Sequence, residues 1–237
     1  MANSYFKFKQ FTIHQHKCAM KVCTDACLFG AVTANDKMQS GNCLDIGTGT
    51  GLLSLMVAQK NNSAIIDAIE IDTNAAEQAL ENITASPWAN RIQVINKDIL
   101  KLRTKKQYDF IFSNPPFFED DLLSADKSKN NAKHNTSLTL IKLLKFVDPH
   151  LTADVLFTLL LPYQRVDYFI EEAKKTGFHL SRQILVKQTL KHKFFRGILS
   201  FKRKETKPQY SEIFIKDINQ NYTPEFSALL KDYYLFL

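Results

Sequence analysis

The chain has 237 residues, of which 45% are hydrophobic, and this is enough for one sizeable domain with a small appendage. It contains no apolar run of about eighteen residues, which excludes a transmembrane helix, and its first residues lack the apolar core of a secretory signal. The formal net charge of +7 indicates a polyanionic partner without identifying it.

Four cysteines lie in the first fifth of the chain: Cys18, Cys23, Cys27 and Cys43. Three of them with a nearby histidine could imitate a zinc site. However, they form no Cys-x-x-Cys pair, and their spacing fits no common structural site. We therefore expect reduced thiols, no bound metal and a cytoplasmic protein.

The segment from Leu44 to Ala58 predicts a short buried strand, a glycine-rich turn and an apolar helix. Glycines let the backbone approach a ligand that a Cβ would block, and a helix N-terminus offers unpaired N–H groups. The Gly-x-Gly-x-Gly spacing differs from the dinucleotide fingerprint, so a pyrophosphate is not the obvious ligand. An acid just ahead of the glycines would repel phosphate but could hold a cationic or amino-acid group. The alternative is a purely structural loop. The candidate binding residues are Asp45, Gly47, Thr48, Gly49 and Gly51.

Acidic residues follow each of the next two predicted strands. The strand at 64–70 ends in Glu70, and a carboxylate about twenty residues beyond a glycine loop can bind both hydroxyls of a ribose. Asp72 is a second candidate, or else it caps the following helix. The strand at 91–96 precedes Asp98, which could accept a hydrogen bond from the exocyclic amine of a cofactor adenine. The alternative for Asp98 is a solvated loop aspartate.

The fourth predicted strand, 108–113, runs into Asn114, Pro115, Pro116 and Phe117. Two prolines fix their own φ angles, donate no N–H and push the preceding residue out of the helical region, so the turn is stiff and its carbonyls can accept hydrogen bonds. An amide oxygen, a rigid carbonyl and an aromatic ring together suit a flat ring with an exocyclic NH2. The alternative is a plain loop in which the asparagine turns the chain and the phenylalanine packs in the core.

The rest of the chain continues the alternation of strands and helices. The polar stretch 119–136 has no periodicity and predicts a mobile loop beside the site. Periodicity and apolar runs predict a helix at 137–150, a strand at 154–161, a helix at 163–176 closed by Gly177, and two antiparallel strands at 178–187 and 195–202. This order predicts an α/β three-layer sandwich, with a Rossmann-like, seven-stranded, mostly parallel sheet and an antiparallel hairpin at its C-terminal end. Ligands are expected at the carboxyl ends of the strands.

A basic segment covers the end of this pattern, with aromatic residues His192, Phe194, Phe195 and Phe201 interleaved and Glu205 as its one acid. Basic residues can neutralise phosphates and aromatic rings can stack on unpaired bases, so the segment predicts a nucleic-acid surface. The alternative is an ordinary hairpin with a solvated outer face, and for Phe201 we expect burial. The basic residues are Lys187, Lys191, Lys193, Arg196, Lys202, Arg203, Lys204 and Lys207.

The glycine loop, the acid after the second strand, the Asp after the third and Asn-Pro-Pro-Phe after the fourth together resemble class I S-adenosylmethionine-dependent methyltransferases that modify amino groups. The resemblance covers nearly the whole chain. It implies S-adenosyl-L-methionine as cofactor, bound by the glycine-loop residues with Glu70, Asp98 and Asn114. It also implies Asn114, Pro115, Pro116 and Phe117 as the catalytic residues.

A closer resemblance is to bacterial tRNA1(Val) (adenine37-N6)-methyltransferases, carried by residues 11–13, 20–31, 66–72 and 81–92. It implies that Lys21, Thr24 and Asp25 line the cofactor side of the pocket, although either of the last two could instead cap a helix at 26–33. The family pattern has Thr-Asp-Gly where this chain has Thr24-Asp25-Ala26, which puts a tight positive-φ turn there in doubt. His134 matches a family position of unclear role, with a surface histidine as the default.

The resemblance implies methylation of an exposed, unstacked adenine in the anticodon stem-loop of tRNA. It divides the chain into an extension at 1–40 that contributes to the pocket and a methyltransferase domain at 41–237. RNA would be read by the extension, the loop after Phe117 and the basic hairpin. Enzymes with the same motif also methylate guanine N2 in ribosomal RNA, adenine N6 in DNA and glutamine in release factors. A non-catalytic RNA-binding protein is a further alternative, and the sequence predicts no oligomeric state.

Overall fold

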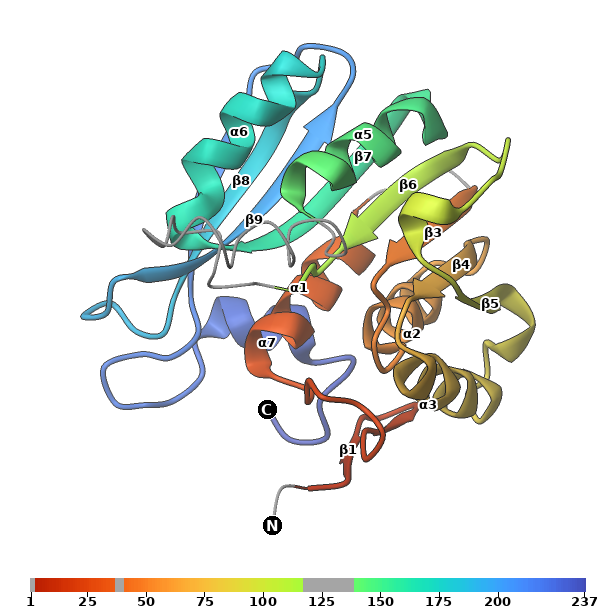
Figure 1. Ribbon diagram of the computed structural model, residues 1–237. Coiled ribbons are helices and arrows are strands. Elements are labelled where there is room, and N and C mark those ends of the chain that lie inside the picture. The colour runs from red at the N-terminus through yellow and green to blue at the C-terminus, as the bar shows by residue number, and fades with distance from the viewer. Residues whose placement is uncertain (1–2, 37–40, 117–138) are drawn as a thin grey trace, which may run out of the picture.

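The computed structural model describes residues 3–36, 41–116 and 139–237. Its centre is an eight-stranded sheet in the order β10-β8-β9-β7-β6-β3-β4-β5 (Figure 1). β9 is antiparallel to both of its neighbours, and every other pair in the sheet is parallel. The strands are β3 (Asn42–Ile46), β4 (Ile65–Glu70), β5 (Ile92–Asn96), β6 (Tyr108–Ser113), β7 (Leu151–Pro162), β8 (His179–Lys187), β9 (Phe194–Lys202) and β10 (Gln209–Phe214).

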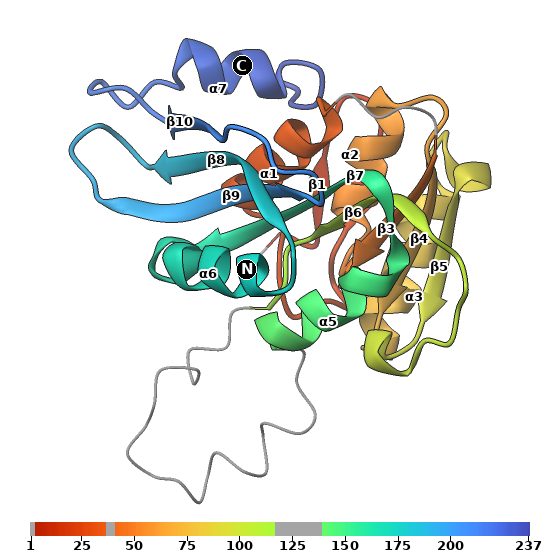
Figure 2. The same ribbon diagram turned by 90° about the horizontal axis from the view of Figure 1, so that it is seen from above.

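Helices cover both faces of the sheet, which confirms the predicted three-layer α/β fold (Figures 1 and 2). On one face lie α1 (Thr24–Ala34), α2 (Leu52–Lys60), α3 (Thr73–Thr84) and α7 (Pro224–Leu230), and on the other lie α5 (Leu140–His150) and α6 (Val166–Lys175). A small hairpin of β1 (Tyr5–Lys7) and β2 (Thr12–His14) stands apart from the main sheet.

The central strands are mostly apolar because both of their faces are covered. In β6, Phe112 packs in the cluster beneath α1 and α2, whereas its neighbour Ile111 packs in the cluster beneath α5 and α6. In β7, Leu160 and Leu161 divide between the same two clusters. Phe201 is fully buried, as the sequence predicts. Within the described residues, no helix is long and apolar enough to cross a membrane.

The structure corrects three predictions. The alternation of strand and helix breaks between β5 and β6, where the fully described connection contains only the short 3-10 turn η2 (Ile99–Lys101). Helix α1 begins earlier than expected, with Cys23 as its N-cap, so Thr24 and Asp25 lie inside its first turn and neither one caps it. Because this turn is helical, it needs no positive φ and accommodates Ala26.

The third correction concerns the C-terminal region, where β10 adds an eighth strand and α7 follows it. The predicted helix at 163–176 is present as a 3-10 turn η4 (Tyr163–Arg165) followed by α6. Gly177 has a φ of 76° just after this helix, as expected of a residue that terminates it. The predicted loop at 119–136, which contains His134, lies outside the described residues, and so does Phe117.

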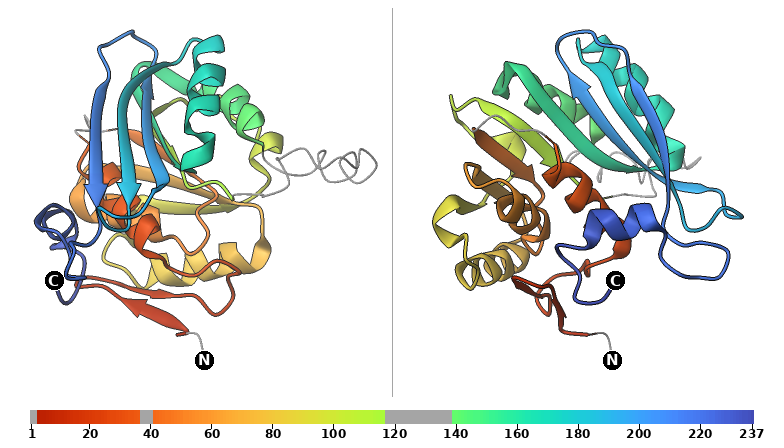
Figure 3. Two further views of the ribbon diagram at one scale, coloured as in Figure 1. Left: turned by 90° about the vertical axis from the view of Figure 1, so that its left-hand side faces the viewer. Right: turned by 180° about the vertical axis from the view of Figure 1, so that it is seen from behind.

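Parallel pairing places the carboxyl ends of β3, β4, β5, β6, β7, β8 and β10 along one border of the sheet, which we call the site edge. The reversed strand β9 starts at this edge, because Pro162 of β7 pairs with Arg196 and Lys187 of β8 pairs with Phe194. The β8–β9 connection, 188–193, is therefore at the site edge. The β9–β10 connection, 203–208, is at the opposite edge (Figure 3).

Candidate active site

Strand register brings the ends of β3, β4 and β6 to one level at the site edge. Ile46 pairs with Ser113 on one side and with Ile69 on the other. The next residue on each strand is therefore Gly47, Asn114 or Glu70, and neighbouring strands lie about 5 Å apart. The structure thus gathers the start of the glycine loop, the asparagine and the second acid in one place.

The glycine loop turns away from β3 with its backbone held against β4. The N–H groups of Gly47 and Thr48 both donate to the carbonyl of Ile69, at 2.9 and 3.0 Å. Gly47 and Gly49 have φ angles of 74° and 57°, and a Cβ built on either would meet no described atom within 4 Å. Open space on the inner side of a backbone that only glycine adopts easily is the geometry expected of a ligand cradle.

The far end of the loop is fixed by packing and by one asparagine that the sequence reasoning missed. A Cβ on Gly51 would come within 3.3 Å of Ile83 on α3. The Asn82 side chain donates to the carbonyls of Thr50 and His14, at 2.9 and 2.8 Å. Asn82 thereby joins the N-terminal hairpin to the glycine loop. Its position on the buried face of an amphipathic helix, where a polar residue needs partners, was the available signal.

Asp45 lies beneath the loop and is completely buried. Its Oδ2 accepts hydrogen bonds from the hydroxyls of Thr48 and Ser54, both at 2.7 Å. Its Oδ1 is buried without a hydrogen-bond partner among the described residues. Burial raises the pKa of Asp45 to about 6, although the two hydroxyls lower it. The carboxyl therefore organises the loop and keeps one oxygen able to accept a further donor.

Glu70 links the glycine loop to the start of α3. Its Oε2 accepts from the N–H of Gly49 at 2.9 Å, and its Oε1 accepts from the N–H of Asp72 at 3.0 Å. The side chain is buried, with 8% of its surface exposed. Asp72 itself caps α3 by accepting from the Ala75 N–H at 2.8 Å, which is the structural alternative considered for it.

Asp98 follows β5 and also has a local structural role. Its Oδ1 accepts from the N–H of Leu100 at 2.9 Å and caps η2, while Lys101 lies 3.9 Å from its other oxygen. The end of β5 is tied to β4 because the Asn96 amide donates to the carbonyl of Glu70 at 2.9 Å. Asp98 therefore sits at the same edge as Glu70, two residues beyond the end of β5.

Asn114 directly follows β6, where Ser113 donates to the carbonyl of Ile46 at 2.8 Å and fixes the strand against β3. The Oδ1 of Asn114 is buried and has no hydrogen-bond partner among the described residues. Pro115 is buried and Pro116 is exposed, whereas Phe117 lies outside the described part of the chain. A buried amide oxygen without a partner is costly, and it is a natural acceptor for the N–H of a ligand.

The N-terminal segment approaches the site from the side of Glu70. The Lys21 ammonium donates to the carbonyls of Gln15 and Cys18. The pKa of Cys18 is raised to about 11, first by burial and then by the charge of Glu70. Lys21 therefore closes a turn within the segment, and the Asn82 amide joins His14 of the same segment to the glycine loop.

Helix α1 faces a different neighbour. The Oδ2 of Asp25 accepts from the Nε of Arg196 on β9 at 2.7 Å, and both side chains are largely buried. Thr24 is half-buried in the same first turn. The structure thus gives Lys21 partners within the N-terminal segment and directs the Asp25 carboxylate toward β9. All four cysteines are described and none forms a disulfide.

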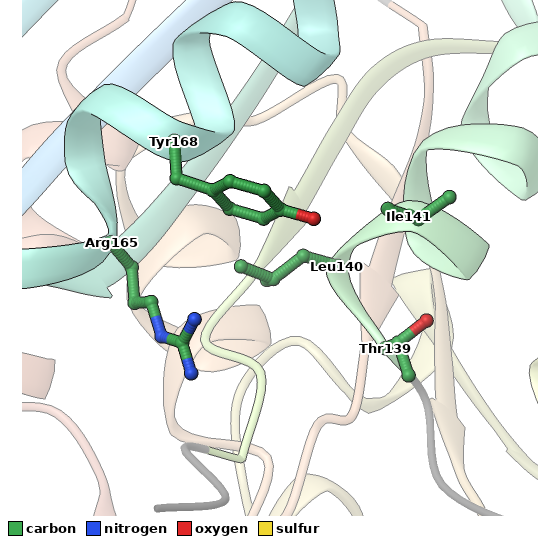
Figure 4. A pocket seen from close by; sticks show the side chains of 5 residues that line it. All are labelled: Thr139, Leu140, Ile141, Arg165 and Tyr168. Atoms are coloured by element: carbon green, nitrogen blue, oxygen red, sulfur yellow. The ribbon is translucent and has the colours of Figure 1, made fainter. Parts of the chain in front are cut away.

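A shallow pocket of about 260 Å³ opens between the start of α5 and the η4–α6 turn (Figure 4). In the figure the Tyr168 ring points from α6 toward Leu140 and Ile141, while Arg165 extends beside them from η4. Thr139 completes the lining. The pocket belongs to the site edge but contains none of the predicted site residues.

The residues at the centre of the site fit S-adenosylmethionine. The open cradle at Gly47 and Gly49 suits close approach of the ligand, and the carboxylate of Glu70 suits ribose hydroxyls. The remaining oxygen of Asp45 suits an ammonium donor. At the edge of a mostly parallel sheet covered by helices on both faces, these features define a class I S-adenosylmethionine-dependent methyltransferase.

Comparisons with known proteins agree with this class. Residues 26–133 match the Methyltransferase small domain family. The tRNA1(Val) (adenine(37)-N6)-methyltransferase of Dyadobacter fermentans is 42% identical over 98% of both chains, and that of Bacteroides fragilis is 40% identical over 99% of both. A methyltransferase structure from Pyrococcus furiosus superposes with a TM-score of 0.60 at 23% identity, over 81% of this chain and 89% of that one. The chain belongs to the family of tRNA1(Val) (adenine(37)-N6)-methyltransferases.

Proposed function

We propose that this chain methylates the exocyclic N6 of adenine 37 in the anticodon loop of tRNA1(Val), with S-adenosyl-L-methionine as methyl donor. The proposal is supported by relatives that bear this activity in their names and match the chain over almost its full length. The structural observation that carries it is the buried Oδ1 of Asn114, which lacks a partner among the described residues and stands level with the glycine loop. A tRNA substrate places the enzyme in the cytoplasm.

Asn114 and Pro115 act as acceptors for the substrate amine. The adenine N6 lone pair is delocalised into the ring, so the free amine is a poor nucleophile. When the Asn114 Oδ1 and the Pro115 carbonyl accept the two N–H groups, they turn the amine so that its lone pair points toward the glycine loop. Phe117 follows directly in the sequence and is the residue proposed to stack on the base.

The cradle holds the cofactor through backbone and carboxylate groups. Gly47, Thr48, Gly49 and Gly51 form its backbone wall, and Glu70 and Asp98 receive the ribose hydroxyls and the adenine amine. Lys21 and Thr24 close the side that faces the N-terminal segment. S-adenosylmethionine supplies a methyl group already activated on a sulfonium, so no strong base is required of the protein. The rate then depends on alignment and on preorganised acceptors.

Enzymes with the same motif on ribosomal RNA guanine or release-factor glutamine are the competing functions. The first test is transfer of radiolabelled methyl from S-adenosylmethionine to bulk tRNA from a strain that lacks this gene, followed by nucleoside analysis. We expect the label in N6-methyladenosine. Label on ribosomal RNA or on a release factor instead would preserve the methyltransferase chemistry and overturn the tRNA assignment.

A matched pair of asparagine variants places the amine site. Asn114→Ala should remove the label while leaving the affinity for S-adenosylmethionine within a few-fold of wild type. Asn90→Ala changes an exposed asparagine of the 3-10 turn η1 (Ala89–Arg91), which precedes β5 at the opposite edge, and should leave the label unchanged. Equal activity of the two variants would show that the Asn114 side chain takes no part in the reaction.

A further inference from the structure

The basic segment 187–207 is divided by the fold into two groups at opposite edges of the sheet. Strand β9 runs for nine residues through its middle, which is a span of roughly 26 Å. Lys187, Lys191 and Lys193 lie at the site edge, where β8 ends and β9 begins. Lys204 and Lys207 lie beyond the far end of β9 (Figure 1). One run in the sequence is thus two separate surfaces, and only one of them lies at the same edge of the sheet as Asn114.

The two arginines of the segment have structural partners. Arg196 binds Asp25 of α1. Arg203 binds the side chain and the carbonyl of Asp148, and its guanidinium lies 4.2 Å from the ring centroid of Phe178. Lys187 is also paired, since its ammonium lies 3.8 Å from the carboxylate of Glu212, so the charge of this segment that could meet a polyanion at the site edge is carried mainly by the exposed Lys191 and Lys193. The structure thus separates the exposed lysines of the hairpin from the paired Lys187, Arg196 and Arg203, which the sequence could not do.

The tip of the β8–β9 hairpin is a loop held in one conformation by hydrogen bonds. Thr189 is buried at 3% exposure, its hydroxyl lies 2.7 Å from Nδ1 of His192, and the same oxygen accepts from the N–H of Lys191 at 3.3 Å. The carbonyl of Gln188 accepts from the N–H of Lys216 at 2.9 Å. With its base fixed in this way, the loop presents Lys191 and Lys193 to solvent.

An exposed aromatic ring lies between the hairpin and the asparagine. Tyr163 is the first residue after β7, the strand next to β6, and 40% of its surface is exposed. Its ring centroid is 5.3 Å from that of Phe194, and the Lys187 ammonium lies 4.1 Å from the Phe194 centroid on β9. β9 is two strands from β6, a lateral distance of about 10 Å. A nucleotide bound at Asn114 would have its neighbours within reach of this group.

We propose that RNA docks on the hairpin surface, defined as Tyr163, Lys187, Lys191, His192 and Lys193. The lysines contact phosphates on one side of the target nucleotide, and Tyr163 stacks on an unpaired base. The basic residues at the opposite edge take no part in binding. The proposal rests on the proposed function, because it requires an RNA substrate whose reactive base enters beside Asn114.

Two double variants that remove equal charge test the proposal. Lys191→Ala with Lys193→Ala changes the hairpin surface, and Lys204→Ala with Lys207→Ala is the matched control, since all four lysines are exposed. Binding of unmodified tRNA is measured by fluorescence anisotropy at several salt concentrations. We expect the hairpin variant to bind about tenfold more weakly, with the salt dependence of log K reduced by about 2, and the control to bind as wild type does.

Tyrosine variants test the stacking contact separately. Tyr163→Ala should raise the KM for tRNA roughly five- to hundredfold, the range expected when one stacked base is lost, and Tyr163→Phe should stay close to wild type. Tyr210→Ala is the control, because Tyr210 is 67% exposed and stands near the first residue of β10, at the opposite edge. An unchanged KM for tRNA in Tyr163→Ala would show that Tyr163 does not contact the RNA.

The outcomes separate the two proposals. Equal weakening by both lysine variants would mean general attraction by net charge and would overturn the hairpin surface, as would weakening by the control alone. Wild-type protein that transfers no methyl to tRNA defeats the proposed function by its own assay, whatever the binding data show. The affinity of each variant for S-adenosylmethionine verifies that it is folded, and Lys191→Gln with Lys193→Gln repeats the measurement with a polar side chain of similar length.

Discussion

The backbone N–H of Gly49 donates to Oε2 of Glu70 at 2.9 Å, so the glycine loop and the acid at the end of the next strand form one hydrogen-bonded unit. The other carboxylate oxygen accepts from the Asp72 N–H. Both partners are fixed backbone groups. The orientation of the carboxylate is therefore set by the fold.

Replacing Glu70 by Gln should weaken the binding of S-adenosylmethionine about tenfold or more. The amide keeps one acceptor oxygen but loses the charge, and hydrogen bonds to charged groups contribute about 1.5–3 kcal/mol. Glu70→Ala should weaken binding further, because Gly49 also loses its anchor. Isothermal titration calorimetry measures both affinities. The control is Glu171→Gln, an exposed position on α6, and an affinity for Glu70→Gln equal to that of this control would contradict the role of Glu70.

Gly47→Ala should weaken cofactor binding by more than its effect on stability explains. The φ of Gly47 is 74° and that of Gly177 is 76°, so alanine should cost each about 1 kcal/mol of unfolding free energy through backbone strain. Space around both is open enough to accept the methyl group. Only the alanine at Gly47 would project into the cradle.

Urea unfolding and cofactor titration of the two glycine variants make the comparison. We expect similar losses of stability in Gly47→Ala and Gly177→Ala, and loss of S-adenosylmethionine affinity in the first alone. Unimpaired binding by Gly47→Ala would show that the open space beside this residue is not part of the cofactor site.

Asp45 should make the stability of the ligand-free protein fall as the pH rises from about 4 to 6. Burial raises the pKa of Asp45 to about 6, above its ordinary value of 3.8. The folded state therefore binds more protons than the unfolded state within this window. By linkage, the stabilisation is complete below pH 4 and is lost as the pH rises through 6.

The Asp45→Asn variant isolates this effect, because every other titrating group remains. The stability of wild type relative to Asp45→Asn should decline by about 2–3 kcal/mol between pH 4 and pH 7.5, since one pKa unit corresponds to about 1.4 kcal/mol. Chemical unfolding at several pH values measures the difference. A difference independent of pH would mean that the carboxyl is ionised throughout.

The pattern of apolar and polar residues was sufficient for the three-layer α/β class and for the position of the glycine loop at the end of its strand, but not for every element. Apolar runs located β6 and β7, and the break in periodicity at Gly47 located the loop, because these signals are local in sequence. The extra strand β10 was missed. Its six residues are mostly exposed and lack the apolar run of a central strand, so its place depends on pairing with β8.

Contacts between distant segments could not be predicted either, because they too depend on which parts of the chain the fold brings together. Nothing near Asn82 in the chain shows that its amide will join His14 to the glycine loop. The basic run 187–207 was recognised as basic, but its division into two edges follows from the reversed direction of β9, which is a property of the sheet. All of the predicted cofactor and substrate contacts remain predictions, those of Glu70 and Asn114 as much as those of Lys21, Thr24, Asp98 and Phe117.

The Asp25–Arg196 pair should couple the N-terminal segment to the hairpin strand. It joins the first turn of α1 to β9 at 2.7 Å, with side-chain exposures of 12% and 26%. Arg196→Ala should lower the unfolding free energy by more than Asp25→Ala does. It removes the cation that neutralises a nearly buried carboxylate, whereas in Asp25→Ala the guanidinium still donates to the carbonyl of Phe195.

A double-mutant cycle measures the coupling, which we expect to be about 1–2 kcal/mol for this pair. The control cycle uses Glu172 and Lys175 of α6, an ion pair whose lysine is 67% exposed, and there we expect no measurable coupling because water and salt screen the charges. A coupling for Asp25–Arg196 as small as that of the surface pair would mean that α1 and β9 are held together by apolar packing alone.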